Sequence, residues 1–297
     1  MVEQLYHTPD IYRIYVPLPD NPLKYLNCYV LVSDGETLII DTGFNRPECK
    51  QALFDGLDEL QVDFAHTKLF LTHLHGDHSG LTEELTARGV PVFMNAIDYD
   101  YLCQELASGG WQAMEQIFLS EGFPMEEIEK QKKGNQARLY SPHHPFPASK
   151  VSDNDLLTVG GITLRCIQTP GHTPGHTCLY IEDKEIFFSG DHILFDITPN
   201  ISVWRNIPYS LADYLESLQK IKGLKVSHTF PGHREFHGDI HDRINALALH
   251  HHARLKEILD AIDHHPDCTA YETAGRISWS SRGRAWSDFS PYQKWFA

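Results

Sequence analysis

The sequence predicts an α/β fold, because short apolar runs of strand type alternate with segments of helical periodicity. Residues 68–72 form an apolar run of the kind found in buried strands. Residues 81–88 follow with a helical pattern that ends at Gly89, and residues 90–94 form the next apolar run. A strand, a helix and a strand at this spacing are typical of α/β proteins.

The N-terminal part of the chain predicts a β-hairpin followed by a helix. Residues 27–32 and 37–40 have strand-like patterns and flank Asp34-Gly35, a pair that favours a tight hairpin turn. Residues 47–60 carry apolar side chains at helical spacing. We therefore expect strands to precede the first helix.

A different pattern occupies residues 96–147, where helical periodicity predicts a helical insertion over the main sheet. Insertions of this kind often shape substrate pockets. Beyond residue 155 the strand pattern returns, and a mostly helical segment follows from residue 238 to residue 297. Strands are expected over 162–168, 177–182, 185–189 and 226–230, and helices over 208–222 and 244–262.

Composition narrows the class of protein. The 25 basic and 40 acidic side chains give a net charge of −15, which repels polyanions and argues against a nucleic-acid partner. No stretch approaches the roughly 20 apolar residues of a membrane span, and the N-terminus lacks a secretory signal pattern, so a cytoplasmic protein is expected. The six cysteines contain no CxxC pair and are expected to be reduced, partly buried thiols.

Histidine is abundant, with 19 residues, and several histidines cluster at ligand spacing. The motif His73-x-His75-x-Asp77-His78 directly follows a predicted buried strand. In an extended segment residues two apart face the same way, so His73 and His75 can bind one metal ion. Asp77 and His78, after the bend at Gly76, are then free to bind a second ion. The motif therefore predicts a metal site.

Three further loops place a histidine or an aspartate directly after a predicted strand. Ligands of open α/β folds gather at the carboxyl ends of strands, so we expect these loops to meet the first motif. A glycine beside each candidate ligand lets the backbone approach closely. The loops are Gly171-His172, Gly190-Asp191 and Pro231-Gly232-His233.

Taken in order, these motifs resemble those of the metallo-β-lactamase superfamily, and within it the glyoxalase II-like and lactonase-like hydrolases. The resemblance covers roughly residues 10–237 and implies an αββα sandwich. It also implies a catalytic domain over residues 1–237, with residues 238–297 similar to the winged-helix-like cap of some members. The matching residues are Asp41-Thr42-Gly43, His73-Leu74-His75-Gly76-Asp77-His78, Gly171-His172, Gly190-Asp191 and Pro231-Gly232-His233.

The resemblance implies a site for two divalent metal ions. Asp41 is expected to orient a ligand or its loop from outside, His176 to be structural, and His192 to face away. The donors are all nitrogen or oxygen, which suits zinc, our expectation, and also iron or manganese. The other histidine clusters, at 143–144, 250–252 and 264–265, are expected to lie mostly on the solvated surface. The implied ligands are His73, His75 and His172 for one ion, Asp77, His78 and His233 for the other, and Asp191 as the bridge.

The implied reaction is hydrolysis of a small ester, lactone or thioester by a hydroxide that bridges two metals, with Asp77 carrying the proton. A phosphodiesterase or ribonuclease with the same site stays open, as do a mononuclear-iron sulfur dioxygenase and a non-catalytic metal-binding protein. A small molecule is the expected partner, and a homodimer is the general expectation. A basic strip favouring a nuclease could come from Arg205, Lys220, Lys222, Lys225 and Arg234.

Overall fold

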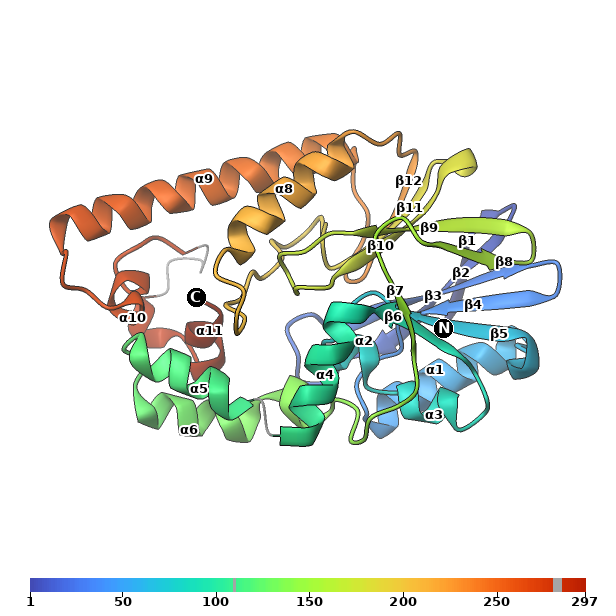
Figure 1. Cartoon of the computed structure of the whole chain (residues 1–297), viewed down its shortest axis with the longest axis horizontal. Coiled ribbons are helices and arrows are strands. Elements are labelled where there is room, and N and C mark those ends of the chain that lie inside the picture. Colours follow the sequence, from blue (N-terminus) through green and yellow to red (C-terminus); the bar gives the residue numbers. More distant parts are fainter. Residues whose placement is uncertain (109–110, 280–284) are drawn as a thin grey trace.

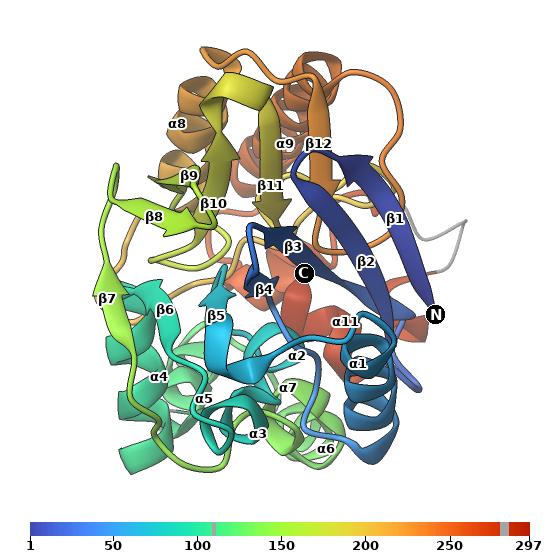
Figure 2. The same ribbon diagram turned by 90° about the vertical axis from the view of Figure 1, so that its right-hand side faces the viewer.

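Two mixed β-sheets lie face to face at the centre of the molecule, and helices cover both outer faces (Figures 1 and 2). This arrangement comes from a computed structural model that describes residues 1–108, 111–279 and 285–297. The αββα sandwich implied by the resemblance is confirmed, and the sequence motifs fall on the loops that join its strands and helices.

The larger sheet has seven strands in chain order. Its first four strands pair antiparallel, and from the fourth to the seventh the pairing is parallel. Asp34 and Gly35 both have positive φ, 45° and 78°, as a tight hairpin turn requires. The strands are β1 (Val2–His7), β2 (Asp10–Pro17), β3 (Tyr25–Ser33), β4 (Glu36–Ile40), β5 (Thr67–Leu71), β6 (Val92–Asn95) and β7 (Ser149–Val151).

Helices cover the outer face of this sheet. In the described residues, the predicted insertion is present as four helices between β6 and β7. One helical turn, α2 (Gly76–Ser79), was not predicted and carries the second half of the histidine motif. The elements are α1 (Pro47–Glu59), η1 (Phe64–His66), α2 (Gly76–Ser79), α3 (Thr82–Thr86), α4 (Ala96–Ser108), α5 (Trp111–Ser120), α6 (Met125–Gly134) and α7 (Gln136–Leu139).

The smaller sheet has five strands, and only its β11–β12 pair is parallel. Two long helices cover its outer face, and the chain ends in short helices (Figure 1). The elements are β8 (Leu156–Val159), β9 (Ile162–Gln168), β10 (Thr177–Ile181), η2 (Glu182–Lys184), β11 (Ile186–Gly190), α8 (Ser210–Lys222), β12 (His228–Pro231), α9 (Ile240–His264), α10 (Ala270–Ala274), η3 (Trp286–Asp288) and α11 (Pro291–Phe296).

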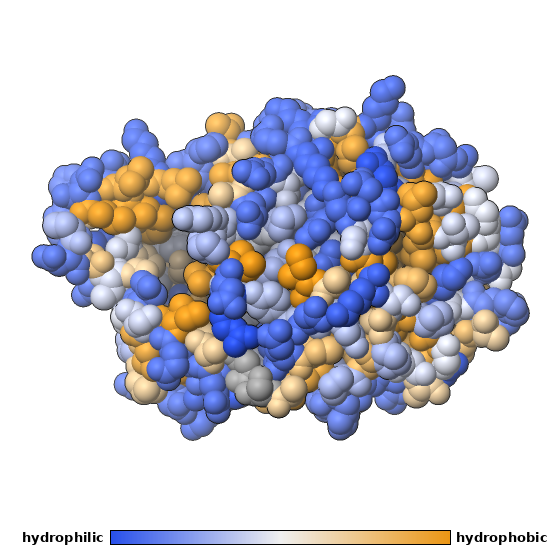
Figure 3. All heavy atoms as spheres, in the orientation of Figure 1, coloured by the Kyte–Doolittle hydropathy of each residue, from blue (hydrophilic) through white to orange (hydrophobic). Residues whose placement is uncertain are grey.

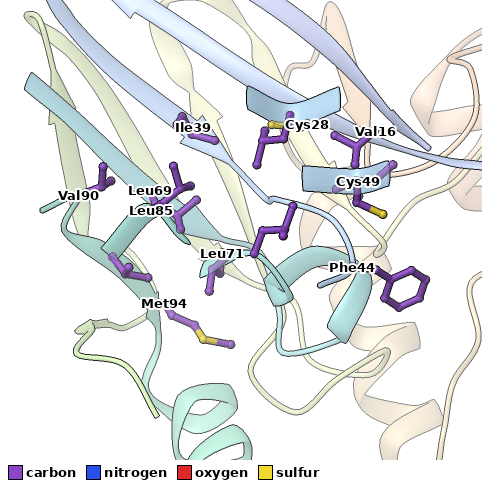
Figure 4. Close-up of a cluster of buried hydrophobic side chains, with 14 of the residues drawn as sticks. Val16, Cys28, Ile39, Phe44, Cys49, Leu69, Leu71, Leu85, Val90 and Met94 are labelled. Carbon is purple, nitrogen blue, oxygen red and sulfur yellow. The ribbon is translucent and has the colours of Figure 1, made fainter. Parts of the chain in front are cut away.

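Three apolar layers hold the sandwich together. One lies between the larger sheet and its helices and includes Leu69 and Leu71 of β5 (Figure 4). A second lies between the sheets, where Phe70 of the same strand faces the other way. The third lies between the smaller sheet and helices α8 and α9. Because β5 is buried on both faces, it reads as a continuous apolar run in the sequence.

The C-terminal segment packs back onto the insertion. The ring of Trp295 in α11 stacks on Phe118 of α5, with centroids 3.6 Å apart, and Lys294 pairs with Glu127 of α6 at 3.0 Å. No β-strand follows β12 in the described residues, and the domain division at residues 237/238 stays a prediction. None of the helices in the described ranges has the length and apolar character needed to cross a membrane.

Candidate metal centre

The candidate ligands from four loops lie together where strands of both sheets end. His73 and His75 follow β5, and His75 caps α2, whose first turn carries Asp77 and His78. The helical turn directs the second pair away from the first, which an extended segment alone would not do. The remaining candidate ligands, His172, Asp191 and His233, follow β9, β11 and β12.

The first group of donors is His73, His75 and His172, whose ligand atoms lie within 4.8 Å of one another. The His73 Nε2 and His75 Nδ1 atoms are 3.1 Å apart. Burial lowers the pKa of all three imidazoles, to about 3 for His75, so each is neutral at pH 7. A neutral imidazole offers the lone pair that a metal ion requires.

The second group is Asp77, His78 and His233, again with donor atoms within 4.8 Å. His233 Nε2 lies 3.2 Å from His78 Nε2 and 3.3 Å from Asp77 Oδ2. Burial alone would lower the pKa of both imidazoles, but nearby carboxylates, Asp191 among them, raise it above the usual value. Without a cation, protons on these rings therefore balance the carboxylate charge.

Asp191 lies between the two groups. Its carboxylate oxygens are 3.5 Å from Nε2 of His78 and of His233, and 3.6 Å from Nε2 of His172. Asp191 Oδ1 and His172 Nε2 are buried and have no hydrogen-bond partner in the described part of the chain. Buried polar atoms are normally paired, so these residues fit a centre in which cations complete the contacts. The position suits Asp191 as a bridge between two ions.

Contacts from outside the centre orient the candidate ligands. Asp41 Oδ2 lies 2.8 Å from His78 Nδ1, and the same carboxylate accepts hydrogen bonds from the backbone N–H and the hydroxyl of Thr72. His172 Nδ1 donates to the carbonyl oxygen of Asn200 at 2.6 Å, and His233 Nδ1 to that of Tyr25 at 2.9 Å. Each contact turns Nε2 toward the centre, as expected for metal-binding histidines.

His176 touches the centre through the backbone of Asp191, whose N–H donates to His176 Nε2 at 3.1 Å. The adjacent Gly190 has φ of 48°, and a Cβ there would lie 2.7 Å from the same nitrogen. A Cβ on Gly232 would lie 2.6 Å from Asp191 Oδ1. Glycine is therefore required at both positions by close packing. The His192 ring is buried against Tyr214, with centroids 5.2 Å apart.

Asp98, at the start of α4, is a residue that the sequence did not single out. Its buried carboxylate accepts hydrogen bonds from the backbone N–H of Leu74 at 3.0 Å, and from the Thr173 hydroxyl and the Gly175 N–H at 2.6 Å each. Burial raises the pKa of Asp98 to about 6 although these hydrogen bonds oppose the shift. Asp98 thus ties the His73–His78 loop to the His172 loop.

Other histidines differ in their surroundings. His144 is exposed and pairs with Glu83 at 3.1 Å. His251 is an exception to the expected surface location of the 250–252 run, because it is buried and packs edge-on against Tyr214 at 5.3 Å. Helical spacing on α9 directs it inward. Trp204, also not singled out from the sequence, lies nearly parallel to His75 and donates to the His172 carbonyl oxygen at 3.3 Å.

Comparisons with known proteins agree with this geometry. The profile of the metallo-beta-lactamase superfamily matches residues 22–233. The chain belongs to this superfamily. A solved metallo-beta-lactamase family protein from Thermus thermophilus shares 31% identity and a TM-score of 0.78, covering 89% of this chain and 86% of that one. Membership of the superfamily accounts for the fold and for the two His/Asp clusters, which are its typical metal site. It also gives the activity class, a metal-dependent hydrolase.

Two curated relatives are more distant. The Beta-lactamase-like protein 2 homolog of Caenorhabditis elegans is 24% identical over 256 residues, covering 86% of this chain and 71% of that protein. The atrochrysone carboxyl ACP thioesterase of Cryptosporiopsis sp. (strain 8999) is 25% identical over 266 residues, covering 88% of this chain. This chain spans 65% of the length of that thioesterase.

Zinc binding is expected to release protons and to strengthen as the pH rises. The pKa values of His78 and His233 are raised, which favours protonated rings in the metal-free protein, and a ring with a proton on Nε2 must lose it to bind an ion. Calorimetric titration with Zn²⁺ in buffers of different ionisation enthalpy, between pH 6 and pH 8, measures the release. No proton release, or an affinity independent of pH, would contradict this charge balance.

Asp98→Asn is expected to weaken both the fold and the metal site. An amide in place of the carboxylate offers fewer acceptors to the buried donors, which costs about 1–3 kcal/mol. Because both ligand loops lose their common contact, zinc affinity should fall by roughly 10- to 100-fold. Thermal unfolding and metal titration measure the two effects. Asp100→Asn, which removes an exposed pairing with Lys150 on the same helix, should change neither.

Proposed function

We propose that the protein hydrolyses thioesters of bulky, apolar acyl groups at a two-metal centre formed by His73, His75, Asp77, His78, His172, Asp191 and His233. This proposal rests on the location of the centre at the wall of a large cavity. His75, Asp77 and Asp191 form part of the lining of a cavity of about 950 Å³, which we call the chamber. Its volume is at the upper end of the range typical of small-molecule sites.

The walls of the chamber are largely apolar and come from distant parts of the chain. They are formed by the insertion, by the segment that follows β11, and by helices α9 and α11. The surface is hollowed between α9 and helices α5 and α6, and apolar residues border the hollow (Figure 3). Such walls favour a substrate with a large apolar group. The apolar residues that line the chamber include Leu74, Trp111, Phe118, Trp204, Leu211 and Trp295.

The choice of a thioester rests on the curated relatives, one of which is named an ACP thioesterase and matches most of this chain. An acyl thioester has an apolar acyl part and a polar thiol arm. This suits a chamber whose walls are largely apolar and whose lining also includes the polar residues His75, Asp77 and Asp191. In the hydrolysis, a water oxygen bonds to the acyl carbon, the carbon–sulfur bond breaks, and a proton passes to the departing sulfur. The products are a carboxylic acid and a thiol.

Divalent cations in this centre would lower the pKa of a shared water and polarise the acyl oxygen. Asp77 is the residue that we assign to proton transfer. Burial alone would raise its pKa, but the hydrogen bond from His233 and the charge of His78 hold it at about 2. The carboxylate is therefore ionised at neutral pH, able to orient the attacking water, accept its proton and release that proton to the leaving group.

The contacts of the basic side chains support a small-molecule substrate over a polyanion. Lys220 pairs with Asp153 at 2.7 Å, and Lys222 binds the side chain of Asn245 at 2.8 Å. Arg234 binds the Pro22 carbonyl oxygen, and among the five candidates for a basic strip it is Arg205 that lines the chamber. A phosphodiesterase and a mononuclear-iron sulfur dioxygenase stay as alternatives, and a homodimer and a cytoplasmic location stay predictions.

The zinc-loaded protein is expected to hydrolyse the benzoyl thioester of N-acetylcysteamine faster than the acetyl thioester, because the benzoyl group fills more of the chamber. Release of the free thiol measures the rate. Asp191→Ala should lower kcat/KM by about a thousandfold, because the residue between the two groups of ligands is lost. Asp183→Asn, in a surface turn, is the matched control and should leave the rate unchanged.

The proposal is wrong if thioesters are not hydrolysed while a phosphodiester such as bis(p-nitrophenyl) phosphate is. Uptake of oxygen with a persulfide substrate, without hydrolysis, would instead indicate the dioxygenase. Equal rates for the benzoyl and acetyl thioesters would leave a thioesterase but contradict the role of the apolar walls.

A further inference from the structure

The C-terminal helix α11 is firmly anchored at the wall of the chamber. Ser290 and Gln293 form a capping box at its start, and Pro291 occupies its first turn. Trp295 stacks on Phe118 at an interplanar angle of 6°, and Lys294 pairs with Glu127. These contacts fix α11 against α5 and α6, so its inward-facing side chains have defined positions relative to the metal centre.

Tyr292 and Gln293 of α11 both combine a polar group with a place in this wall, but the side-chain oxygen of Gln293 is used in the capping box. Tyr292 lines the same cavity as His75, Asp77 and Asp191. Its ring packs edge-on against Phe296, with centroids 4.4 Å apart and an interplanar angle of 89°. The ring is thereby held in place, and the hydroxyl is the part of the side chain left to interact with a bound molecule.

The hydroxyl of Tyr292 has no hydrogen-bond partner among the residues that the structure describes. Tyr101, the other tyrosine among the described residues that line this cavity, differs, because its hydroxyl donates to the backbone carbonyl oxygen of Arg205. A hydroxyl in a largely apolar wall offers one of the few polar contacts there for a bound molecule. The hydroxyl of Tyr292 is therefore available to pair with a molecule bound in the chamber.

The protonation state of Tyr292 suits a donor. Burial and, to a smaller extent, the nearby charge of Asp77 raise its pKa above the ordinary value of a tyrosine. The phenol is protonated across the range in which enzymes usually work, and it can donate one hydrogen bond. Tyr292 lines the same cavity as Asp77, the residue that we assign to proton transfer.

We infer that Tyr292 is a substrate-binding residue whose hydroxyl donates a hydrogen bond to the acyl oxygen of the thioester. The inference rests on the proposed function, and it assigns to the C-terminal segment a direct part in the reaction. When the water oxygen bonds to the acyl carbon, negative charge develops on the acyl oxygen. A donor aimed at that oxygen stabilises the transition state more than the bound substrate.

The test compares Tyr292→Phe with wild type, using zinc-loaded protein. The substitution removes the hydroxyl but keeps the ring against Phe296, so zinc content and thermal unfolding should not change. We expect kcat/KM for the benzoyl thioester to fall by about 10- to 100-fold, mostly in kcat. The Kd of 2-naphthoate, measured by quenching of tryptophan fluorescence, should rise about fivefold as one hydrogen bond is lost. Tyr6→Phe, on the edge strand β1, is the matched control.

The two readouts separate failure of this inference from failure of the proposed function. If wild type hydrolyses no thioester, the proposed function is wrong, and the Kd of 2-naphthoate alone decides the role of Tyr292. The inference is overturned if Tyr292→Phe leaves both values within twofold of wild type. It is also overturned if wild type fails to bind 2-naphthoate, because the wall that carries Tyr292 then does not hold an acyl group.

Discussion

The buried charge of Asp77 and Asp191 is the constraint on which the rest of the centre depends. Carboxylates this deeply buried are unfavourable unless positive charge and hydrogen bonds compensate them. In the metal-free protein, raised pKa values let His78 and His233 supply that charge as protons. Cations can replace those protons, because the other imidazoles are held neutral by burial. The buried carboxylates therefore make the metal-free site energetically unfavourable, and for the same reason they favour the binding of metal cations.

The sandwich positions these groups by letting both sheets end at one place. The larger sheet supplies the His73–His78 loop, and the smaller sheet supplies His172, Asp191 and His233, while the apolar layer between the sheets fixes their separation. Asp98 then connects the loops of the two sheets through hydrogen bonds. In the proposed function, the acyl group of the substrate would be contacted mainly by the insertion and α11, which form walls of the chamber. Binding specificity can thus vary without disturbing the metal centre.

Much of this could be predicted from the sequence, because each candidate ligand directly follows a strand and carries an adjacent glycine or a second ligand. Strand β5 was recognisable because burial on both faces makes it apolar throughout, whereas the edge strand β1 is largely exposed and shows no clear alternation. Asp98 and Tyr292 could not be found in this way. Their roles depend on contacts between segments far apart in the chain, and an aspartate at a helix start is also common for reasons of helix stability alone.

The number of metal ions per chain tests the two-metal centre most directly. The measurement is the metal content, by mass spectrometry, of protein purified without added metal and of the same protein after saturation with zinc and removal of excess. We predict close to two ions per chain after saturation, and fewer in Asp191→Ala, since the carboxylate between the two groups of candidate ligands is lost. A single iron per chain that zinc cannot supplement, together with no hydrolysis, would contradict the two-metal hydrolase.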